Sequence, residues 1–176
     1  MAIILRSPDY EDVDSQRLVF LGGPIQGASD WQKEAIRFLL DNLSDRYTIA
    51  SPRSLRTIEE YYGQMEWEHY HLQRAHTIFF WLPCPLSLSF SERLRVLFSG
   101  IPPRPYAQTM WFELGWFTCY CRHFTDKVNL VVGMEHGFPN GRYITHVLNN
   151  KDFSKKIPIE EDLTLALKKT LHILKS

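Results

Sequence analysis

The stretch Thr77-Ile78-Phe79-Phe80-Trp81-Leu82 is a nearly continuous apolar run, which is typical of a strand covered on both of its faces. The run Arg17-Leu18-Val19-Phe20-Leu21-Gly22 lies upstream and ends at a Gly-Gly-Pro turn. Shorter strands are predicted over residues 47–50 and 128–132. Because helical patterns separate these strands, the sequence predicts an open parallel sheet with helices on both faces.

Apolar residues at helical spacing occupy the segments between the predicted strands. The sequence Ser29-Asp30-Trp31-Gln32 has the spacing of a capping box and is followed by apolar residues at helical intervals. Further helices are predicted over residues 58–75, 91–97, 108–120 and 159–175. The helix over residues 58–75 is expected to place Met65 and Leu72 on one apolar face.

The length of the chain suits one domain, predicted to span residues 1–176. Residues 1–16 are interpreted as an N-terminal extension. Residues 83–108 contain five prolines and are interpreted as a long insertion. A loop of that length inside a compact domain is more often functional than idle. Residues 133–150 are expected to be irregular.

The composition excludes several classes of protein. The formal net charge is +0 and the charged fraction is 23%, so no basic surface for nucleic acid or an acidic membrane is expected. The three cysteines have no repeated CxxC spacing, which argues against a disulfide framework and against a zinc site. The apolar piece Ile3-Ile4-Leu5 is too short for a signal peptide or a membrane span. A reduced, cytoplasmic setting is therefore expected.

Ligands of open parallel sheets bind beyond the carboxyl ends of the strands, near the point where the strand order reverses. Three segments are expected at that edge: the turn Gly22-Gly23-Pro24, the segment after Leu82, and the helix start that holds Thr109 and Glu113. Their convergence predicts a binding site there.

Glu113 is the most informative residue, because it lies in the mostly apolar stretch Thr109-Met110-Trp111-Phe112-Glu113-Leu114-Gly115-Trp116. A carboxylate is costly to bury unless a partner or a reaction uses it. Thr109 precedes it by four residues and shares its helix face, and the helix dipole is expected to keep the carboxylate ionised. Glu113 is thus a candidate nucleophile or base. The alternative is an ordinary residue of the first helical turns, paired with Arg or Lys.

The glycine turn and a second helix supply candidate substrate-binding groups. Glycines in Gly22-Gly23-Pro24-Ile25 let a ligand approach the backbone, although an ordinary tight turn explains them equally well. The pattern is not GxGxxG and no P-loop lysine follows, so dinucleotide and Walker-type binding are rejected. Gln64 and Glu68 share a helix face and are candidates to bind substrate hydroxyls, with a solvated helix face as the alternative.

No metal site and no cofactor are expected. His69 and His71 are two residues apart, which places them on different sides of a helix, and HExxH is absent. No nucleophile elbow for a Ser or Cys triad is present either.

Taken together, these residues resemble the nucleoside 2-deoxyribosyltransferase-like family, from about residue 17 to 135. The residues that carry the resemblance are Val19-Phe20-Leu21-Gly22-Gly23-Pro24-Ile25, Asp30-Trp31-Gln32, Ser51-Pro52-Arg53, Gln64 with Trp67-Glu68, Ala75 with Ile78-Phe79-Phe80-Trp81, and Thr109 with Glu113-Leu114-Gly115.

The resemblance implies a flavodoxin-like fold and a homo-oligomer. It also implies that Glu113 attacks the anomeric carbon of a deoxynucleoside, forms a glycosyl-enzyme, and is released by a second base or by water, with net retention. Two acidic positions of the transferases hold His76 and Ala107 here. His76 is a candidate general acid or a surface residue at a helix end. Trp81 and Trp111 are candidates to stack on a base or to lie in the core.

Three functions remain open at this stage. The first is an enzyme that cleaves or transfers the N-glycosidic bond of a nucleoside or nucleotide, with Arg53 as a possible phosphate ligand. The second is a non-catalytic nucleotide-sensing module on the same fold. The third is a structural oligomerisation domain.

Overall fold

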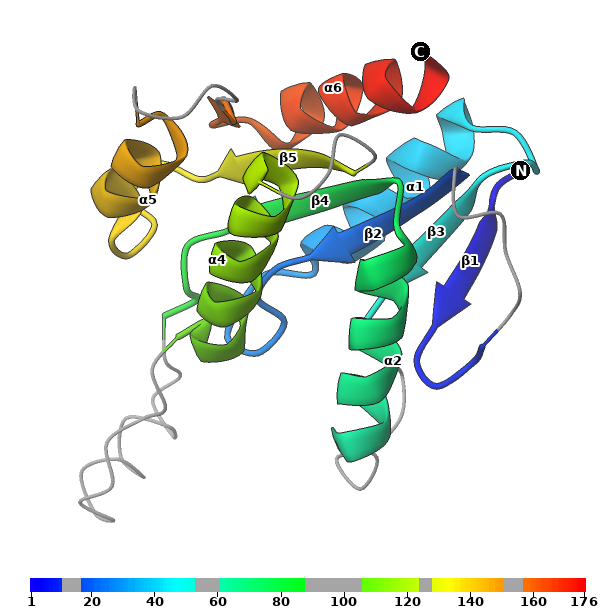
Figure 1. Ribbon diagram of the computed structural model, residues 1–176, viewed down its shortest axis with the longest axis horizontal. Helices are drawn as coiled ribbons and strands as arrows, with labels where there is room; N and C mark the ends of the chain where they lie inside the picture. Colours follow the sequence, from blue (N-terminus) through cyan, green and yellow to red (C-terminus); the bar gives the residue numbers. More distant parts are fainter. Residues whose placement is uncertain (11–16, 53–60, 88–105, 124–127, 151–156) are drawn as a thin grey trace.

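The computed structural model describes residues 1–10, 17–52, 61–87, 106–123, 128–150 and 157–176. A single sheet lies between two layers of helices (Figure 1). The predicted segment 91–97, the start of the helix predicted over 58–75, and Arg53 lie outside the described residues. The prediction of one domain over residues 1–176, with an insertion at 83–108, stays a prediction.

The described strands form one sheet, in which every neighbouring pair is parallel. The strands are β1 Ile3–Arg6, β2 Leu18–Gly22, β3 Thr48–Ser51, β4 Thr77–Leu82, β5 Asn129–Met134 and β6 Ile159–Glu160. Their order is β1-β3-β2-β4-β5-β6. The predicted open parallel sheet of the flavodoxin-like class is confirmed.

Helices cover both faces of this sheet (Figure 1). The described helices are α1 Trp31–Asn42, α2 Tyr61–Arg74, α4 Gln108–His123, α5 Gly141–Leu148 and α6 Leu163–Lys175. Helices α1 and α6 contact each other on one face, whereas α2 and α4 lie on the other. Each face of the sheet therefore has its own apolar core.

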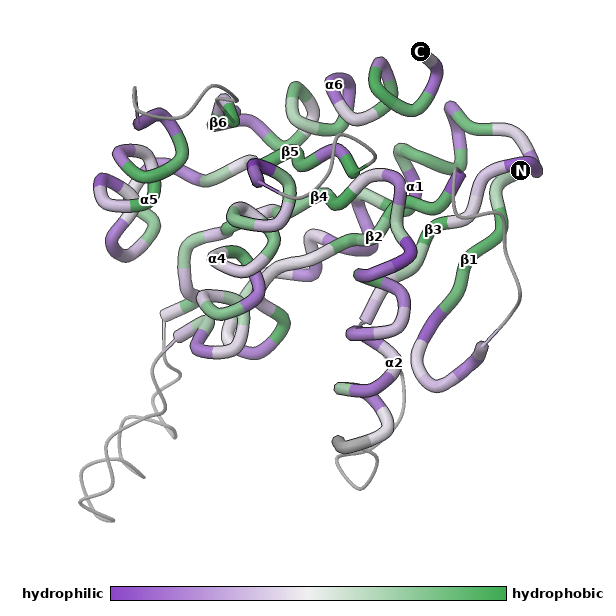
Figure 2. Tube along the Cα trace, viewed as in Figure 1, coloured by the Kyte–Doolittle hydropathy of each residue, from purple (hydrophilic) through white to green (hydrophobic). Residues whose placement is uncertain are grey.

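Strand β4 divides its side chains between the two cores. Ile78, Phe80 and Leu82 enter the core beneath α2 and α4, which we call the α2/α4 core. Phe79 and Trp81 enter the core beneath α1 and α6, which we call the α1/α6 core. This alternation is the two-residue period of a strand, and it requires apolar residues at both the odd and the even positions of β4. Figure 2 shows the resulting hydrophobic character of the central strands.

The strand order reverses at β2, which lies between β3 and β4. The chain leaves β2 through α1 on one face of the sheet and leaves β4 toward α4 on the other. This divergence separates the two connections beyond the carboxyl ends of β2 and β4, where parallel α/β sheets bind ligands.

Several elements differ from the sequence analysis. Edge strand β1, in which Ile3 lies opposite Thr48 of β3, was not among the predicted strands. Residues 141–148, expected to be irregular, form α5, because Ile144 and Leu148 bury one side of a short helix. The helix predicted from residue 159 begins later, after the two-residue strand β6. Such short elements carry too few residues to establish a period.

Two details of the predicted helices also differ. The N-cap residue of α1 is Asp30 rather than Ser29, the first residue of the predicted capping box, and the side chain of Asp30 makes no capping hydrogen bond. In α2, Met65 is 49% exposed, whereas Trp67 and Leu72 are buried. The buried stripe of α2 is thus rotated from the predicted one, because Trp67 packs toward Phe20 of β2.

Gly23 and Gly115 provide a matched pair of substitutions. Gly23 has φ +143°, and a Cβ there would lie 2.2 Å from the carbonyl oxygen of Trp81. Gly115 is exposed within α4, and a Cβ there would meet nothing within 4 Å. We expect Gly23→Ala to destabilise the fold by roughly 2 kcal/mol or more, and Gly115→Ala to stabilise it by up to about 1 kcal/mol. Urea unfolding measures both, and equal effects would contradict the packing described for Gly23.

Candidate functional site

Glu113 lies in the second turn of α4, the helix that begins at the carboxyl edge of the sheet. Met110, Leu114 and Phe117 bury one side of α4 in the α2/α4 core. Glu113 is adjacent to this buried stripe and is itself partly buried. Its carboxyl group is therefore held at the border of the core rather than in bulk water.

The two flanks of α4 face different neighbours. Trp111 packs against Phe138, with ring centroids 5.8 Å apart, and Arg122 donates hydrogen bonds to the carbonyl oxygens of Val147 and Leu148. That flank faces α5. Glu113 is two residues beyond Trp111 and is thus about 200° away round the helix. It consequently lies on the side of α4 away from α5, and Figure 1 shows α2 and α5 on opposite sides of α4.

Helix α2 carries a second carboxyl group. Tyr70 contacts Tyr10, which follows edge strand β1, with ring centroids 5.4 Å apart. Glu68 precedes Tyr70 by two residues and therefore lies about 200° away, on the flank opposite the one that turns toward Tyr10. Gln64 Nε2 donates a hydrogen bond of 2.8 Å to Glu68 Oε1. The predicted alternative of a solvated face does not apply to Glu68, which is partly buried.

Burial and mutual repulsion govern the ionisation of the two carboxyl groups. Burial raises the pKa of Glu113 to about 8, and the charge of Glu68 contributes to this rise. Burial also raises the pKa of Glu68, opposed by the hydrogen bond from Gln64. In the free protein these effects outweigh the helix dipole, so the expectation that Glu113 is ionised at neutral pH is reversed. Within the described residues, neither carboxyl group forms an ion pair.

The glycine turn lies at the same edge and is tightly packed. A Cβ on Gly22 would lie 2.6 Å from the ring of Phe80, and Trp31 Nε1 donates to the carbonyl oxygen of Pro24 at 3.0 Å. Packing alone thus explains both glycines, as the alternative of an ordinary turn predicts. Ile25 is partly buried after the turn.

Thr109 and Gly115 complete the predicted group on α4. Thr109 is exposed one turn before Glu113, at the carboxyl edge of the sheet. The open space beside Gly115 is consistent with close passage of a ligand or of another chain along the helix.

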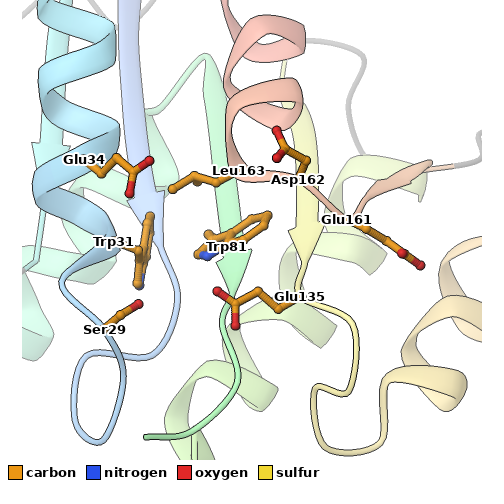
Figure 3. A pocket seen from close by; sticks show the side chains of 8 residues that line it. All are labelled: Ser29, Trp31, Glu34, Trp81, Glu135, Glu161, Asp162 and Leu163. Atoms are coloured by element: carbon orange, nitrogen blue, oxygen red, sulfur yellow. The ribbon is translucent and has the colours of Figure 1, made fainter.

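Trp81 is separated from Glu113 by the sheet. Its side chain is 2% exposed in the α1/α6 core and lines a cavity of about 250 Å³ on that face. Figure 3 shows this cavity, whose lining residues are Ser29, Trp31, Glu34, Trp81, Glu135, Glu161, Asp162 and Leu163. The structure therefore does not bring Trp81 to the carboxyl pair. Trp111 lies in the α2/α4 layer but packs against Phe138.

His76 is also remote from the carboxyl edge. It immediately precedes β4, and its backbone bonds to Leu18 and Asn129 place it at the amino edge of the sheet. Its Nδ1 lies 2.9 Å from Thr77 Oγ1, and burial lowers its pKa. This position does not support the hypothesis that His76 is a general acid acting with Glu113.

Two residues at the carboxyl edge were missed in the sequence. Glu135 directly follows β5, and its Oε2 accepts a hydrogen bond of 2.8 Å from the backbone N–H of Cys84. Tyr106 donates to the carbonyl oxygen of Pro83 at 2.8 Å, and burial raises its pKa to about 12, with a contribution from Glu135. An acidic residue three positions after the strand predicted over residues 128–132 was the signal available for Glu135.

Within the described part of the chain, no group of three His, Cys, Asp or Glu residues is arranged to hold a metal ion.

A comparison with known proteins found a family match for the amino-terminal part of the chain. Residues 16–97 match the family model described as nucleoside 2-deoxyribosyltransferase like. This confirms the family resemblance. The match includes β2, β3, β4 and the Gln64–Glu68 segment of α2, and it ends before Glu113. No curated protein matches the chain.

The raised pKa of Glu113 predicts a specific dependence of stability on pH. The unfolded chain releases this proton near the ordinary value of 4.5 and the folded chain near 8, so the free energy of unfolding falls as pH rises between these values. We expect Glu113→Gln to remove this decline. At pH 8 the free energy of unfolding of the variant should exceed that of wild type by on the order of 2 to 4 kcal/mol. Urea unfolding at pH 5 and pH 8 measures it. Exposed Glu66→Gln is the control, and an unchanged slope in Glu113→Gln would contradict the burial of this carboxyl.

Proposed function

We propose that this protein cleaves the N-glycosidic bond of a deoxynucleoside, nucleoside or nucleotide, with Glu113 as the nucleophile, and passes the sugar to water or to a second base. The family match over residues 16–97 supports a substrate of the nucleoside class. The observation that carries the proposal is the partly buried Glu113, on which the charge of Glu68 acts.

The chemistry requires two steps at the anomeric carbon. In the first, a carboxylate oxygen of Glu113 forms a bond to this carbon while the bond to the base nitrogen breaks. In the second, the acceptor oxygen or nitrogen displaces Glu113. Two displacements on the same carbon retain its configuration, and the same intermediate serves hydrolysis and transfer.

The described residues around Glu113 have corresponding roles in this proposal. Thr109 and Gln64 supply hydroxyl and amide groups for the sugar. In this proposal the substrate also contacts the backbone of Gly22, Gly23, Pro24 and Ile25, which lies at the carboxyl end of β2. His76 has no role in it, because it lies at the opposite edge of the sheet.

Release of free base from a panel of deoxynucleosides, nucleosides and their 5′-monophosphates tests the proposal. Wild-type protein is expected to release base from at least one member, and Glu113→Gln is expected to lower the rate by at least about 1,000-fold, because the amide is a poor nucleophile. Glu66→Gln on α2 is the matched control and should retain wild-type rates.

A 2-fluoro-substituted substrate makes the intermediate observable. Such a sugar destabilises the positive charge of the transition state, so the glycosyl-enzyme is expected to accumulate. Mass spectrometry of the digested protein should place the added sugar on the peptide that contains Glu113. Label on another carboxylate, or undiminished turnover by Glu113→Gln, would contradict the assignment.

A nucleotide-binding module without turnover is the second candidate. Its support is the absence of an acidic side chain at His76 and Ala107, the two positions at which the sequence departs from the transferases. Under this alternative, the same panel raises the melting temperature of the protein by mass action without releasing base. Ligand-dependent melting shifts in wild type, together with no release after prolonged incubation, would favour the sensor over the enzyme.

The remaining expectations concern assembly and location. A homo-oligomer stays a prediction, and the exposed, stacked rings of Phe112 and Trp116 on α4 are consistent with one. No helix in the described ranges has the length and apolarity to cross a bilayer. A cytoplasmic setting, and the absence of nucleic-acid partners and cofactors, also stay predictions.

A further inference from the structure

We propose that Glu68 is a second catalytic carboxyl group, which holds a proton jointly with Glu113, delivers it to the leaving base, and recovers one from the incoming acceptor. This inference rests on the proposed function. It assigns proton transfer to a residue for which the sequence suggested only substrate binding.

The placement of the two helices carries the proposal. Helices α2 and α4 lie on the same face of the sheet, and Trp67 of α2 and Leu114 of α4 enter the same core. Glu68 and Glu113 each directly neighbour one of these buried residues. The Tyr10–Tyr70 contact turns one flank of α2 toward β1, and the Trp111–Phe138 contact turns one flank of α4 toward α5. The two carboxyl groups lie on the opposite flanks of these helices, and the charge of Glu68 acts on Glu113.

The hydrogen bond from Gln64 distinguishes the two oxygens of Glu68. Gln64 Nε2 donates to Oε1, which leaves Oε2 as the oxygen that can carry a proton. The other described acids near the carboxyl edge are differently engaged. Glu34, Glu135, Glu161 and Asp162 line the cavity on the α1/α6 side, and Asp9 follows edge strand β1, toward which the Tyr70 flank of α2 turns. Among the described acids, Glu68 is the one whose charge contributes to the raised pKa of Glu113.

Two carboxyl groups that repel each other in a partly dehydrated space retain one proton between them at neutral pH. The raised pKa values of Glu113 and Glu68 are the expected consequence. A leaving base needs a proton because an anionic base departs slowly. The pair therefore stores the proton that the first step uses.

The proton count balances over the cycle. In the first step the shared proton moves to a ring nitrogen of the base, the electrons of the C–N bond move to the base, and ionised Glu113 bonds to the anomeric carbon. In the second step, Glu68 takes a proton from water as the water oxygen bonds to that carbon, and the electrons of the ester bond return to Glu113. The pair ends with one proton, as it began.

The test compares Glu68→Gln with Glu66→Gln, which alters an exposed carboxyl group on the same helix. Two substrates are used: the nucleoside or nucleotide that wild type cleaves best, and 4-nitrophenyl 2-deoxyribofuranoside, whose nitrophenolate leaves without a proton. We expect Glu68→Gln to slow base release by about 100-fold or more, and to slow the first-turnover burst of nitrophenolate by less than about 10-fold. Glu66→Gln should match wild type on both.

A titration provides a readout independent of turnover. The carboxyl signal of Glu113 in protein labelled with ¹³C-glutamate is identified by its loss in Glu113→Gln. In Glu68→Gln the pKa of Glu113 should fall, because the repelling charge is removed, whereas Glu66→Gln should leave it unchanged.

The outcomes separate this inference from the proposed function. If wild type releases no base and no nitrophenolate, the proposed function fails, and the catalytic role of Glu68 fails with it. If wild type is active but Glu68→Gln slows both substrates equally, Glu68 only positions other groups and the inference is overturned. An unmoved pKa of Glu113 in Glu68→Gln overturns it as well.

Discussion

The burial of strand β4 on both faces is the constraint on which the rest of the structure depends. Its six side chains are all buried and alternate between two cores, so each face of the sheet must be covered by helices. This requirement separates α2 and α4 from α1 and α6. It also decides which core each strand side chain enters, because successive residues of a strand point to opposite faces of the sheet.

The carboxyl pair follows from that division into layers. Helix α2 precedes β4 and α4 follows it, and both lie on the same face, so Glu68 and Glu113 come from segments 45 residues apart along the chain. Each carboxyl is held beside the core by a buried neighbour in its own helix. Under the proposal, dehydration and repulsion keep a proton on the pair, and a substrate that accepts this proton leaves Glu113 ionised and able to attack. The resting protonation state is thus compatible with a nucleophilic role.

The fold class was predictable because it depends on local patterns. The apolar runs at residues 17–22 and 77–82, with helical spacing between them, are long enough to establish their periods. Edge strand β1 and helix α5 were missed because short elements are stabilised mainly by what they contact. Among the site residues, Gly23 was predictable as a turn residue. The sequence also grouped Trp81 and His76 with Glu113, but the structure places Trp81 on the opposite face of the sheet and His76 at the opposite edge.

The sequence by itself determined the parallel sheet, and it predicted a site at the carboxyl edge with Glu113 as the central candidate. Only the tertiary structure decided that the charge of Glu68 acts on Glu113, that Trp81 belongs to the opposite layer, and that His76 lies at the opposite edge. The physical reason is that period and spacing specify which side of its own element a residue occupies. The packing of elements onto the two faces of the sheet specifies which of those sides meet.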